Sequence, residues 1–316
     1  MLARRLAGLS RPVGAVGLGC VGMSAEYNTS DIDDEQSLRV LARALELGVS
    51  LFDTADVYGP FSNERLLGRA FRGRAADAVI ATKVGLVQDP ASGREIRRAD
   101  PAHIRASCDA SLGRLGVDAI DLYYLHRVDP AVPLEESWAA MAGLVAAGKV
   151  RALGLSEVTV AQLDQARAIH PVAAVQSELS LWTRGPLDAV VPWCRAHHAT
   201  FVAYAPLGRG YLTGTVRSAG FQPDDIRSGN PRFTARAMAR NQAILAVIEK
   251  VARRHDATLA QISIAWVLAQ AGHIVAIPGT KRLRYLEENC QAAAIELAAA
   301  DLADLDAVPP ATGDRY

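Results

Sequence analysis

The sequence predicts an α/β fold, a (β/α)8 barrel of the TIM type. Its 316 residues hold eight short apolar runs, and segments with helical apolar spacing lie between them. Buried strands that alternate with helices indicate a parallel sheet covered by helices. Eight such units favour a closed barrel, because that fold takes about 250 residues before additions. No Pro/Ser-rich linker interrupts the chain, so we expect residues 1–316 to form a single domain.

The eight apolar runs are the predicted strands. Each ends in polar residues or glycine, as expected of strands that are buried on both faces and bounded by loops. They cover residues 15–19, 50–54, 78–83, 120–126, 151–156, 173–178, 200–206 and 274–280.

Four segments between the runs have apolar residues at intervals of three and four, which predicts amphipathic helices. They cover residues 35–48, 101–116, 134–149 and 159–170, and several end at glycine. Glycine turns in "RRLAGLSRPVGAVGLG" (4–19) predict a short N-terminal β-hairpin at the barrel floor. The stretch rich in glycine, proline and charge at 208–233 predicts a long loop at the C-terminal face.

Three glycines near the N-terminus have the spacing of a dinucleotide-binding loop. Gly17, Gly19 and Gly22 form G-x-G-x-x-G. That pattern binds a pyrophosphate only where a helix opens directly after it. The polar stretch that follows has no helical apolar spacing until about Leu38. We therefore assign these glycines to the first barrel strand and its loop.

The composition excludes several classes of protein. The 34 basic residues are balanced by 34 acidic ones, so nothing attracts nucleic acid or an anionic membrane. No run of eighteen apolar residues occurs, and we expect a soluble, cytoplasmic protein. The four cysteines lie far apart without a C-x-x-C pair, which signals neither a disulfide framework nor a metal site.

Polar residues at the C-terminal ends of the strands are the candidates for chemistry, because barrels of this type place their active sites there. They are Asp53, Lys83, His126, Ser156, Glu157, Gln176, Tyr204, Thr280 and Lys281, with Tyr58 five residues after Asp53. Each alone is more often a structural or solvated residue. A carboxylate, a lysine, a histidine and a tyrosine from three neighbouring strands can converge on one rim, which indicates an active site.

At these residues the sequence resembles the aldo-keto reductase superfamily. The resemblance implies an NADPH-dependent reductase that converts an aldehyde or ketone to an alcohol. It also implies that Asp53, Tyr58, Lys83 and His126 are the catalytic residues. The motifs that carry it run through nearly the whole chain in the family's order: "LGCVGMS", "LFDTADVYG", "NERLLGRAF", "IATKVG", "LYYLHRVDP", "GKVRALGLSE", "VQSELSLWTR", "AYAPLGRGYLTG" and "IPGTKRLRYLEEN".

The chemistry gives these four residue types separate roles. Hydride addition to a carbonyl leaves an alkoxide, and Tyr58 is the expected general acid that protonates it. A nearby ammonium lowers the pKa of a phenol, which is the expected role of Lys83, and Asp53 holds that lysine charged and in place. His126 is expected to orient the carbonyl oxygen. No metal is required.

The resemblance also implies where NADPH binds. Tyr204 would stack on the nicotinamide, while Ser156 and Gln176 bind its carboxamide. Further expected cofactor contacts are Leu207, Gly208, Gly210 and Gly279.

The adenosine end is expected near the last strand, where such barrels often bind phosphate. A helix that begins near Arg284 would offer free N–H groups beside Thr280, Lys281 and Arg282. The resemblance places the 2′-phosphate there and assigns Glu288 and Asn289 to the adenine.

Four residues on or near the rim are the expected substrate contacts: Met23, Tyr27, Arg127 and Trp182. The chain departs from the family pattern at Glu157, Leu179, Ala205 and Tyr285, where asparagine, tyrosine, serine and arginine are common in relatives.

Two other functions remain open. Lys83 could form a Schiff base, as in an aldolase-like lyase. The chain could instead bind NADPH as a sensor or accessory subunit with little turnover.

Overall fold

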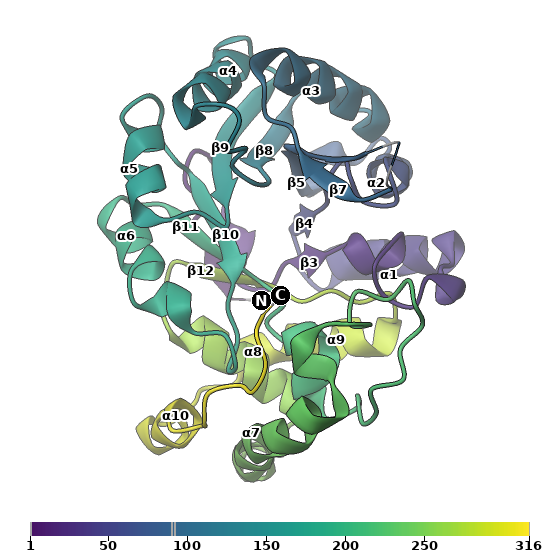
Figure 1. Cartoon of the computed structure of the whole chain (residues 1–316), viewed down its shortest axis with the longest axis vertical. Coiled ribbons are helices and arrows are strands. Elements are labelled where there is room, and N and C mark those ends of the chain that lie inside the picture. The colour runs from purple at the N-terminus through teal and green to yellow at the C-terminus, as the bar shows by residue number, and fades with distance from the viewer. Residues whose placement is uncertain (1, 90, 92, 316) are drawn as a thin grey trace.

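Eight parallel strands form the central sheet of the computed structural model, which describes residues 2–89, 91 and 93–315 (Figure 1). Their order is β12-β11-β10-β9-β8-β5-β4-β3. Bridges between Val16 and Ala276 and between Gly19 and Gly279 bring the two edge strands together, so the sheet is nearly closed. The predicted (β/α)8 barrel is confirmed. The strands are β3 (Leu18–Gly19), β4 (Leu51–Asp53), β5 (Val79–Val84), β8 (Ile120–Leu125), β9 (Val150–Ser156), β10 (Ala174–Glu178), β11 (Thr200–Tyr204) and β12 (Ile274–Ile277).

Helices surround this sheet, and the four predicted from apolar spacing correspond to α1, α3, α4 and α5 (Figure 1). Along the chain, α7 and α8 lie between β11 and β12, which pair directly with each other. The α-helices are α1 (Asp34–Glu46), α2 (Ser62–Ala70), α3 (Pro101–Leu115), α4 (Leu134–Ala146), α5 (Val160–Arg167), α6 (Val190–Ala196), α7 (Ala235–Arg254), α8 (Leu259–Ala269), α9 (Leu283–Gln291) and α10 (Ala299–Asp306). Short 3-10 helices are η1 (Val21–Met23), η2 (Thr29–Asp31), η3 (Ala75–Asp77), η4 (Gly185–Leu187), η5 (Gly208–Thr213), η6 (Pro231–Phe233) and η7 (Ala292–Ala294).

Local sequence determines where α3 begins and ends. The side chain of Asp100 accepts a hydrogen bond of 2.9 Å from the N–H of His103, and Pro101 occupies the first helical position. Gly116 ends the helix with a φ of +67°, a conformation that disfavours other residues. The expected boundaries of 101–116 therefore agree with the structure to one residue.

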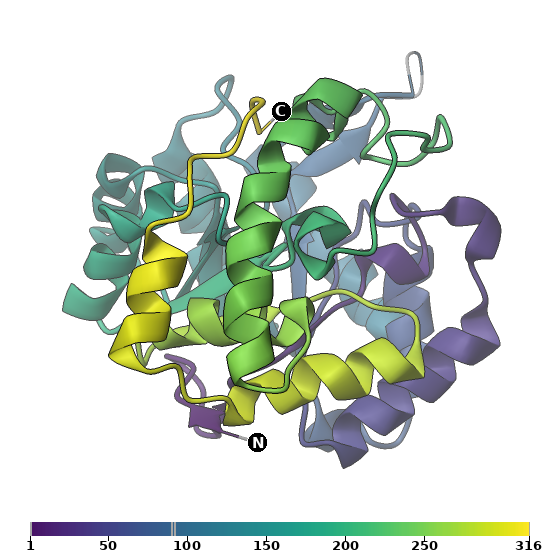
Figure 2. The same ribbon diagram turned by 90° about the horizontal axis from the view of Figure 1, so that it is seen from below.

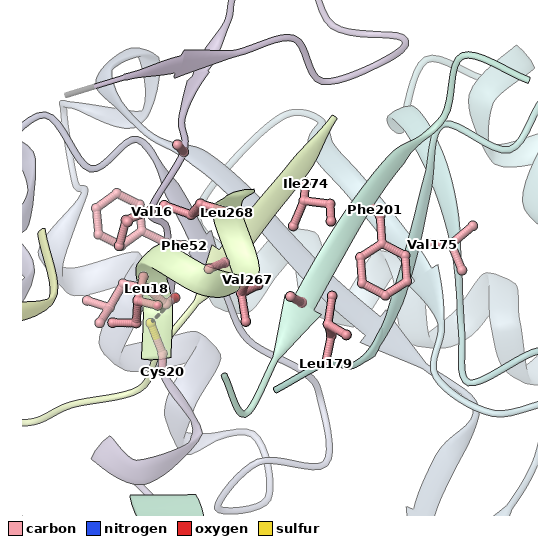
Figure 3. Close-up of a cluster of buried hydrophobic side chains, with 14 of the residues drawn as sticks. Val16, Leu18, Cys20, Phe52, Val175, Leu179, Phe201, Val267, Leu268 and Ile274 are labelled. Carbon is pink, nitrogen blue, oxygen red and sulfur yellow. Dashed lines mark hydrogen bonds between the residues drawn. The ribbon is translucent and has the colours of Figure 1, made fainter. Parts of the chain in front are cut away.

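The core has two layers, one inside the barrel and one between strands and helices. Leu51, Leu122 and Val202 belong to the inner layer. The outer layer joins outward-facing strand residues to the helices. Figure 3 shows part of it and labels Leu18 of β3, Ile274 of β12 and Val267 of α8 within the same cluster.

An antiparallel hairpin of β1 (Ala3–Arg4) and β2 (Val13–Gly14) confirms the predicted N-terminal hairpin. Leu6 and Val13 are buried with the inner core, so the hairpin closes one end of the barrel. Figure 2 shows the N-terminus on the side away from the C-terminus. A second hairpin, β6 (Leu86–Gln88) with β7 (Glu95–Arg97), was not predicted, because strands of three residues are too short to show an alternating pattern.

The N-terminal glycines lie where the sequence places them, in the first strand and its loop. A Cβ at Gly17 would stand 2.9 Å from the carbonyl oxygen of Leu51, and one at Gly19 would stand 3.0 Å from that of Ile277. Gly22 lies in the short η1, and the first α-helix begins only at Asp34. These glycines therefore permit close strand packing, and no α-helix opens behind them.

In the described part of the chain, no helix is long and apolar enough to cross a membrane. Within those same residues, no three His, Cys, Asp or Glu side chains group in a way that could hold a metal ion.

A buried carboxyl in the loop after β4 makes stability depend on pH. Asp56 is 3% exposed, and burial, followed by the charge of Glu64, raises its pKa to about 8. The folded state therefore holds this proton between about pH 4 and pH 8, where the unfolded state has lost it. Asp56 thus stabilises the fold at low pH, and the contribution is lost as the pH rises through that window.

We expect the free energy of unfolding of Asp56→Asn to rise by roughly 2 kcal/mol relative to that of the wild type as the pH goes from 6 to 8, because an amide cannot ionise. Urea unfolding at both pH values measures the gain. The exposed Asp118→Asn is the matched control and is expected to show no such trend. A difference between Asp56→Asn and wild type that stays constant with pH would contradict the assignment.

Candidate active site

Three neighbouring strands bring the four predicted catalytic residues to one rim. Asp53 is the last residue of β4, Lys83 lies near the end of β5, and His126 follows β8 directly. Tyr58 lies in the loop between β4 and α2. The parallel register pairs Asp53 with Ala81 and Lys83 with Tyr124, so the strand ends stand side by side.

Lys83 is the centre of this group and is fully buried. Its ammonium forms a buried ion pair with Asp53. It also donates to the carbonyl oxygen of Thr54 at 2.8 Å and to the hydroxyl of Tyr58 at 3.3 Å. These three partners match the three hydrogens of an ammonium, so the lysine is held charged beside the phenol.

The pKa of Tyr58 differs from the expected direction. Burial, followed by the negative charge of Asp53, raises this pKa well above its usual value near 10. The sequence predicts that Lys83 lowers this pKa, but in the buried site the phenolate's loss of hydration outweighs the nearby cation. The phenol therefore keeps its proton at neutral pH, as a proton donor must.

His126 lies edge-on to Tyr58, with ring centroids 5.9 Å apart and an interplanar angle of 81°. Burial, together with the charges of Lys83 and Arg127, lowers the pKa of His126 well below its usual value. The imidazole is therefore neutral at physiological pH and has one N–H to donate.

A cavity of about 800 Å³ opens over this group and continues to the start of α9. Its size is within the range of pockets for small molecules and cofactors. Lys83 lies beneath Tyr58. The cavity is lined by most of the predicted residues: Tyr27, Asp53, Tyr58, His126, Arg127, Ser156, Gln176, Tyr204, Leu207, Gly210, Gly279, Thr280, Lys281, Arg282, Glu288 and Asn289.

Three predicted residues lie in the core and not in the cavity wall. Met23 is fully buried. Trp182 stacks on Tyr211, with centroids 5.0 Å apart and planes at 9°, and it covers Gly208, where a Cβ would stand 2.6 Å from the indole. Tertiary packing thus keeps Met23, Trp182 and Gly208 out of the cavity lining, and the contacts expected of them stay predictions.

Some cavity residues were missed by sequence reasoning. Arg284 lines the cavity two residues beyond Arg282, and a third cation beside a helix start was a signal that could have found it. Glu26, Glu95 and Arg209 also line the cavity, but they come from loops whose sequence carries no signal of that position. Burial, followed by the charge of Glu95, raises the pKa of Glu26 to about 7.

Two expected nicotinamide contacts have protein partners in this structure. Gln176 donates from Nε2 to Asp53 at 2.7 Å, and Ser156 accepts from Arg127 at 3.0 Å. The Gln176 bond extends the charged group of Lys83 and Asp53 toward β10.

Comparison with known protein families assigns nearly the whole chain to one family. A model of the aldo/keto reductase family matches residues 15–309. The chain belongs to the aldo/keto reductase family. The resemblance found in the motifs is thus confirmed over nearly the whole length.

Individual relatives of this aldo/keto reductase match it along most of their length. It is 39% identical over 308 residues to probable aldo-keto reductase 1 of Glycine max, covering 96% of this chain and 88% of the relative. It is 40% identical over 299 residues to aldo-keto reductase yakc [NADP(+)] of Schizosaccharomyces pombe, covering 93% and 87%.

Solved structures show the same fold. The glycerol dehydrogenase AKR11B4 from Gluconobacter oxydans superposes with a TM-score of 0.88 at 31% identity, covering 97% of this chain and 94% of that one. An aldo/keto reductase from Klebsiella pneumoniae in complex with NADP and acetate gives 0.76 at 28% identity, covering 97% and 95%.

The start of α9 in this aldo/keto reductase is basic. The helix begins at Leu283, one residue before the expected position, and Arg282 is its N-cap. Lys281 donates to the carbonyl oxygens of Tyr27 at 3.1 Å and Asn28 at 3.0 Å. Arg282 forms an ion pair with Asp31. Both cations thus line the cavity and also join α9 to the loop that follows β3.

Proposed function

We propose that the chain reduces the carbonyl of an aldehyde or ketone to an alcohol with NADPH, and that Tyr58 donates the proton. The observation that carries the proposal is the buried chain from Asp53 through Lys83 to the Tyr58 hydroxyl, which ends at the cavity beside His126.

The cavity fits a phosphate-bearing dinucleotide. One end holds the Tyr58 and His126 side chains, and the other holds three cations, Lys281, Arg282 and Arg284, beside the N-terminus of a helix. Such a helix start binds phosphate through its free N–H groups. The Schizosaccharomyces pombe relative is named as an NADP(+) aldo-keto reductase, and the Klebsiella pneumoniae structure is a complex with NADP. Both support the same cofactor here. Bound NADPH would supply the hydride.

The protein's part in the reaction is the handling of the proton. As a C–H bond forms at the carbonyl carbon, the C=O π electrons move to oxygen, and the Tyr58 hydroxyl gives its proton to that oxygen. The resulting phenolate lies against the Lys83 ammonium, which stabilises it. The neutral His126 donates a hydrogen bond that orients the carbonyl oxygen.

A Schiff-base function for Lys83 has little support. Such a lysine must present a neutral amine to the substrate. Lys83 is fully buried, and its ammonium donates to Asp53, to Thr54 and to Tyr58.

The deciding experiment measures NADPH oxidation and alcohol formation with a panel of aldehydes, ketones and quinones. Stoichiometric oxidation and alcohol production are the expected result. NADPH binding without turnover on any of them would favour the sensor or accessory function. Substrate trapped on Lys83 by borohydride would favour the lyase.

The basic start of α9 predicts a preference for NADPH over NADH. Replacing Lys281 and Arg282 together by alanine should raise the Kd of NADPH roughly tenfold or more, since a hydrogen bond to a charged group contributes about 1.5–3 kcal/mol. The Kd of NADH should barely change. Titration of intrinsic fluorescence with each cofactor measures both constants.

The matched control replaces two exposed arginines of α7, Arg236 and Arg240, by alanine. Equal loss of both cofactors in the Lys281 and Arg282 variant would mean that the pair only holds the loop after β3. Equal wild-type affinity for NADH and NADPH would contradict the preference itself.

A further inference from the structure

The chain returns to the barrel mouth after its last helix. Residues 307–315, here called the tail segment, rise beside α7 to the C-terminal face (Figure 2). Thr312 exchanges two hydrogen bonds with Asn241 of α7, at 2.7 and 3.1 Å. Arg232 donates to the carbonyl oxygen of Gly313 at 3.3 Å. The tail segment is thus tied to α7 and to the long loop before it.

A glycine allows this close approach. Gly313 has a φ of +93°, and a Cβ there would stand 2.7 Å from the carbonyl oxygen of Pro231. Asn230 donates to the carbonyl oxygen of Arg315 at 3.1 Å. These contacts place the Arg315 side chain over the ends of three strands.

The Arg315 guanidinium contacts residues from β10, β11 and the end of β9. It donates to the Tyr204 hydroxyl at 2.6 Å and to Glu178 at 2.8 Å, and it forms an ion pair with Glu157 at 2.5 Å. Among these residues Tyr204 lines the cavity, whereas Arg315 is not one of its lining residues. Arg315 therefore reaches the site through Tyr204.

The carboxylates of Glu157 and Glu178 hold the Arg315 guanidinium in place. Glu178 is almost fully buried, and such a charge is costly without partners. Burial would raise the pKa of Glu157, but the hydrogen bond and charge of Arg315 outweigh it and lower that pKa. The same interactions raise the pKa of Arg315 despite its burial. Glu157 and Arg315 are therefore both charged at neutral pH.

Backbone strain occurs at the same place. Glu157 directly follows β9 with a φ of +55°, and Ala205 directly follows β11 with a φ of +46°. Such conformations persist where the surroundings determine them strongly, and they cluster at functional sites. Arg315 contacts Glu157 itself and Tyr204, the residue directly before Ala205.

We propose that Arg315 is a positioning residue, which fixes the Tyr204 ring in the orientation that stacks on the nicotinamide. The proposal rests on the proposed function, since it needs a nicotinamide at Tyr204. Hydride transfer requires that ring to lie in one place, because small errors in the position of reacting atoms are costly in rate. Through this contact the tail segment becomes part of the active site.

The test compares Arg315→Ala, Arg315→Lys, Tyr204→Phe and the Arg315→Ala/Tyr204→Phe double variant. Kd for NADPH, kcat and KM are measured for each. Arg315→Ala should weaken NADPH binding and lower kcat by roughly tenfold each, as for the loss of a hydrogen bond to a charged group. Arg315→Lys should recover part of both losses. In the Tyr204→Phe background, Arg315→Ala should change the Kd of NADPH and kcat much less, because the hydrogen bond from Arg315 to the Tyr204 hydroxyl is already lost.

Arg254→Ala is the matched control, because Arg254 also bridges two carboxylates, Asp301 and Asp304, on the α7 and α10 surface. Its Kd and kcat should equal those of the wild type. Wild-type values in Arg315→Ala, or effects that add fully to those of Tyr204→Phe, would overturn the proposal. Should Arg315→Ala fail to fold, wild-type Kd and kcat in Tyr204→Phe would overturn it too, because that variant removes the same hydrogen bond. A wild-type protein that neither binds nor oxidises NADPH would instead overturn the proposed function.

Discussion

Tyr58→Phe is expected to lower turnover by about 100- to 10,000-fold while leaving NADPH affinity nearly unchanged. The hydroxyl is the group that accepts from Lys83 at 3.3 Å and faces the cavity. Phenylalanine keeps the ring and its packing but cannot donate a proton. Steady-state NADPH oxidation gives the turnover, and fluorescence titration gives the cofactor Kd.

Tyr123→Phe is the matched control for this substitution. Tyr123 is fully buried in β8, and its hydroxyl has no hydrogen-bond partner among the described residues. Loss of that hydroxyl should leave turnover unchanged. A Tyr58→Phe enzyme with most of its activity would remove Tyr58 from the role of general acid.

Lys83→Met is expected to abolish measurable reduction and to destabilise the fold. Methionine has a similar length but no charge, so the Tyr58 phenolate loses its cation, and the buried Asp53 carboxylate keeps its hydrogen bond from Gln176 but loses its cationic partner. Breaking a buried pair in this way costs about 3–5 kcal/mol. Any remaining activity should shift to a different pH profile, because loss of the ammonium raises the Tyr58 pKa further.

A double variant separates catalysis from folding. Lys83→Met/Asp53→Asn removes both charges and should recover much of the lost thermal stability without recovering activity. Lys149→Met, at a partly exposed lysine paired with Asp109, should keep full activity. If the double variant regains reduction along with stability, Lys83 acts only through the fold.

Local pattern explains why the barrel could be predicted. Strands buried on both faces form continuous apolar runs, and the helices between them have apolar residues at intervals of three and four, which follow the helical repeat. Because parallel strands all end at one rim, the positions of Asp53, Lys83 and His126 followed directly from the strand boundaries. The expected start of α9 near Arg284 was correct to one residue.

Loop residues and burial were decided by the tertiary structure alone. Trp182 and Met23 follow strands of the barrel, yet packing against distant residues takes both into the core. The direction of the Tyr58 pKa shift depends on how much water the folded site excludes, which no spacing of residues expresses.

By itself, then, the sequence determined the barrel and the rim on which Asp53, Lys83 and His126 lie, since both depend on local periodicity and strand order. Only the tertiary structure decided which loop side chains reach the cavity and what holds Tyr204. Arg315 meets Tyr204 across 111 residues of chain. A contact of that separation leaves no periodic signal, because it is set by the sum of packing across the whole molecule.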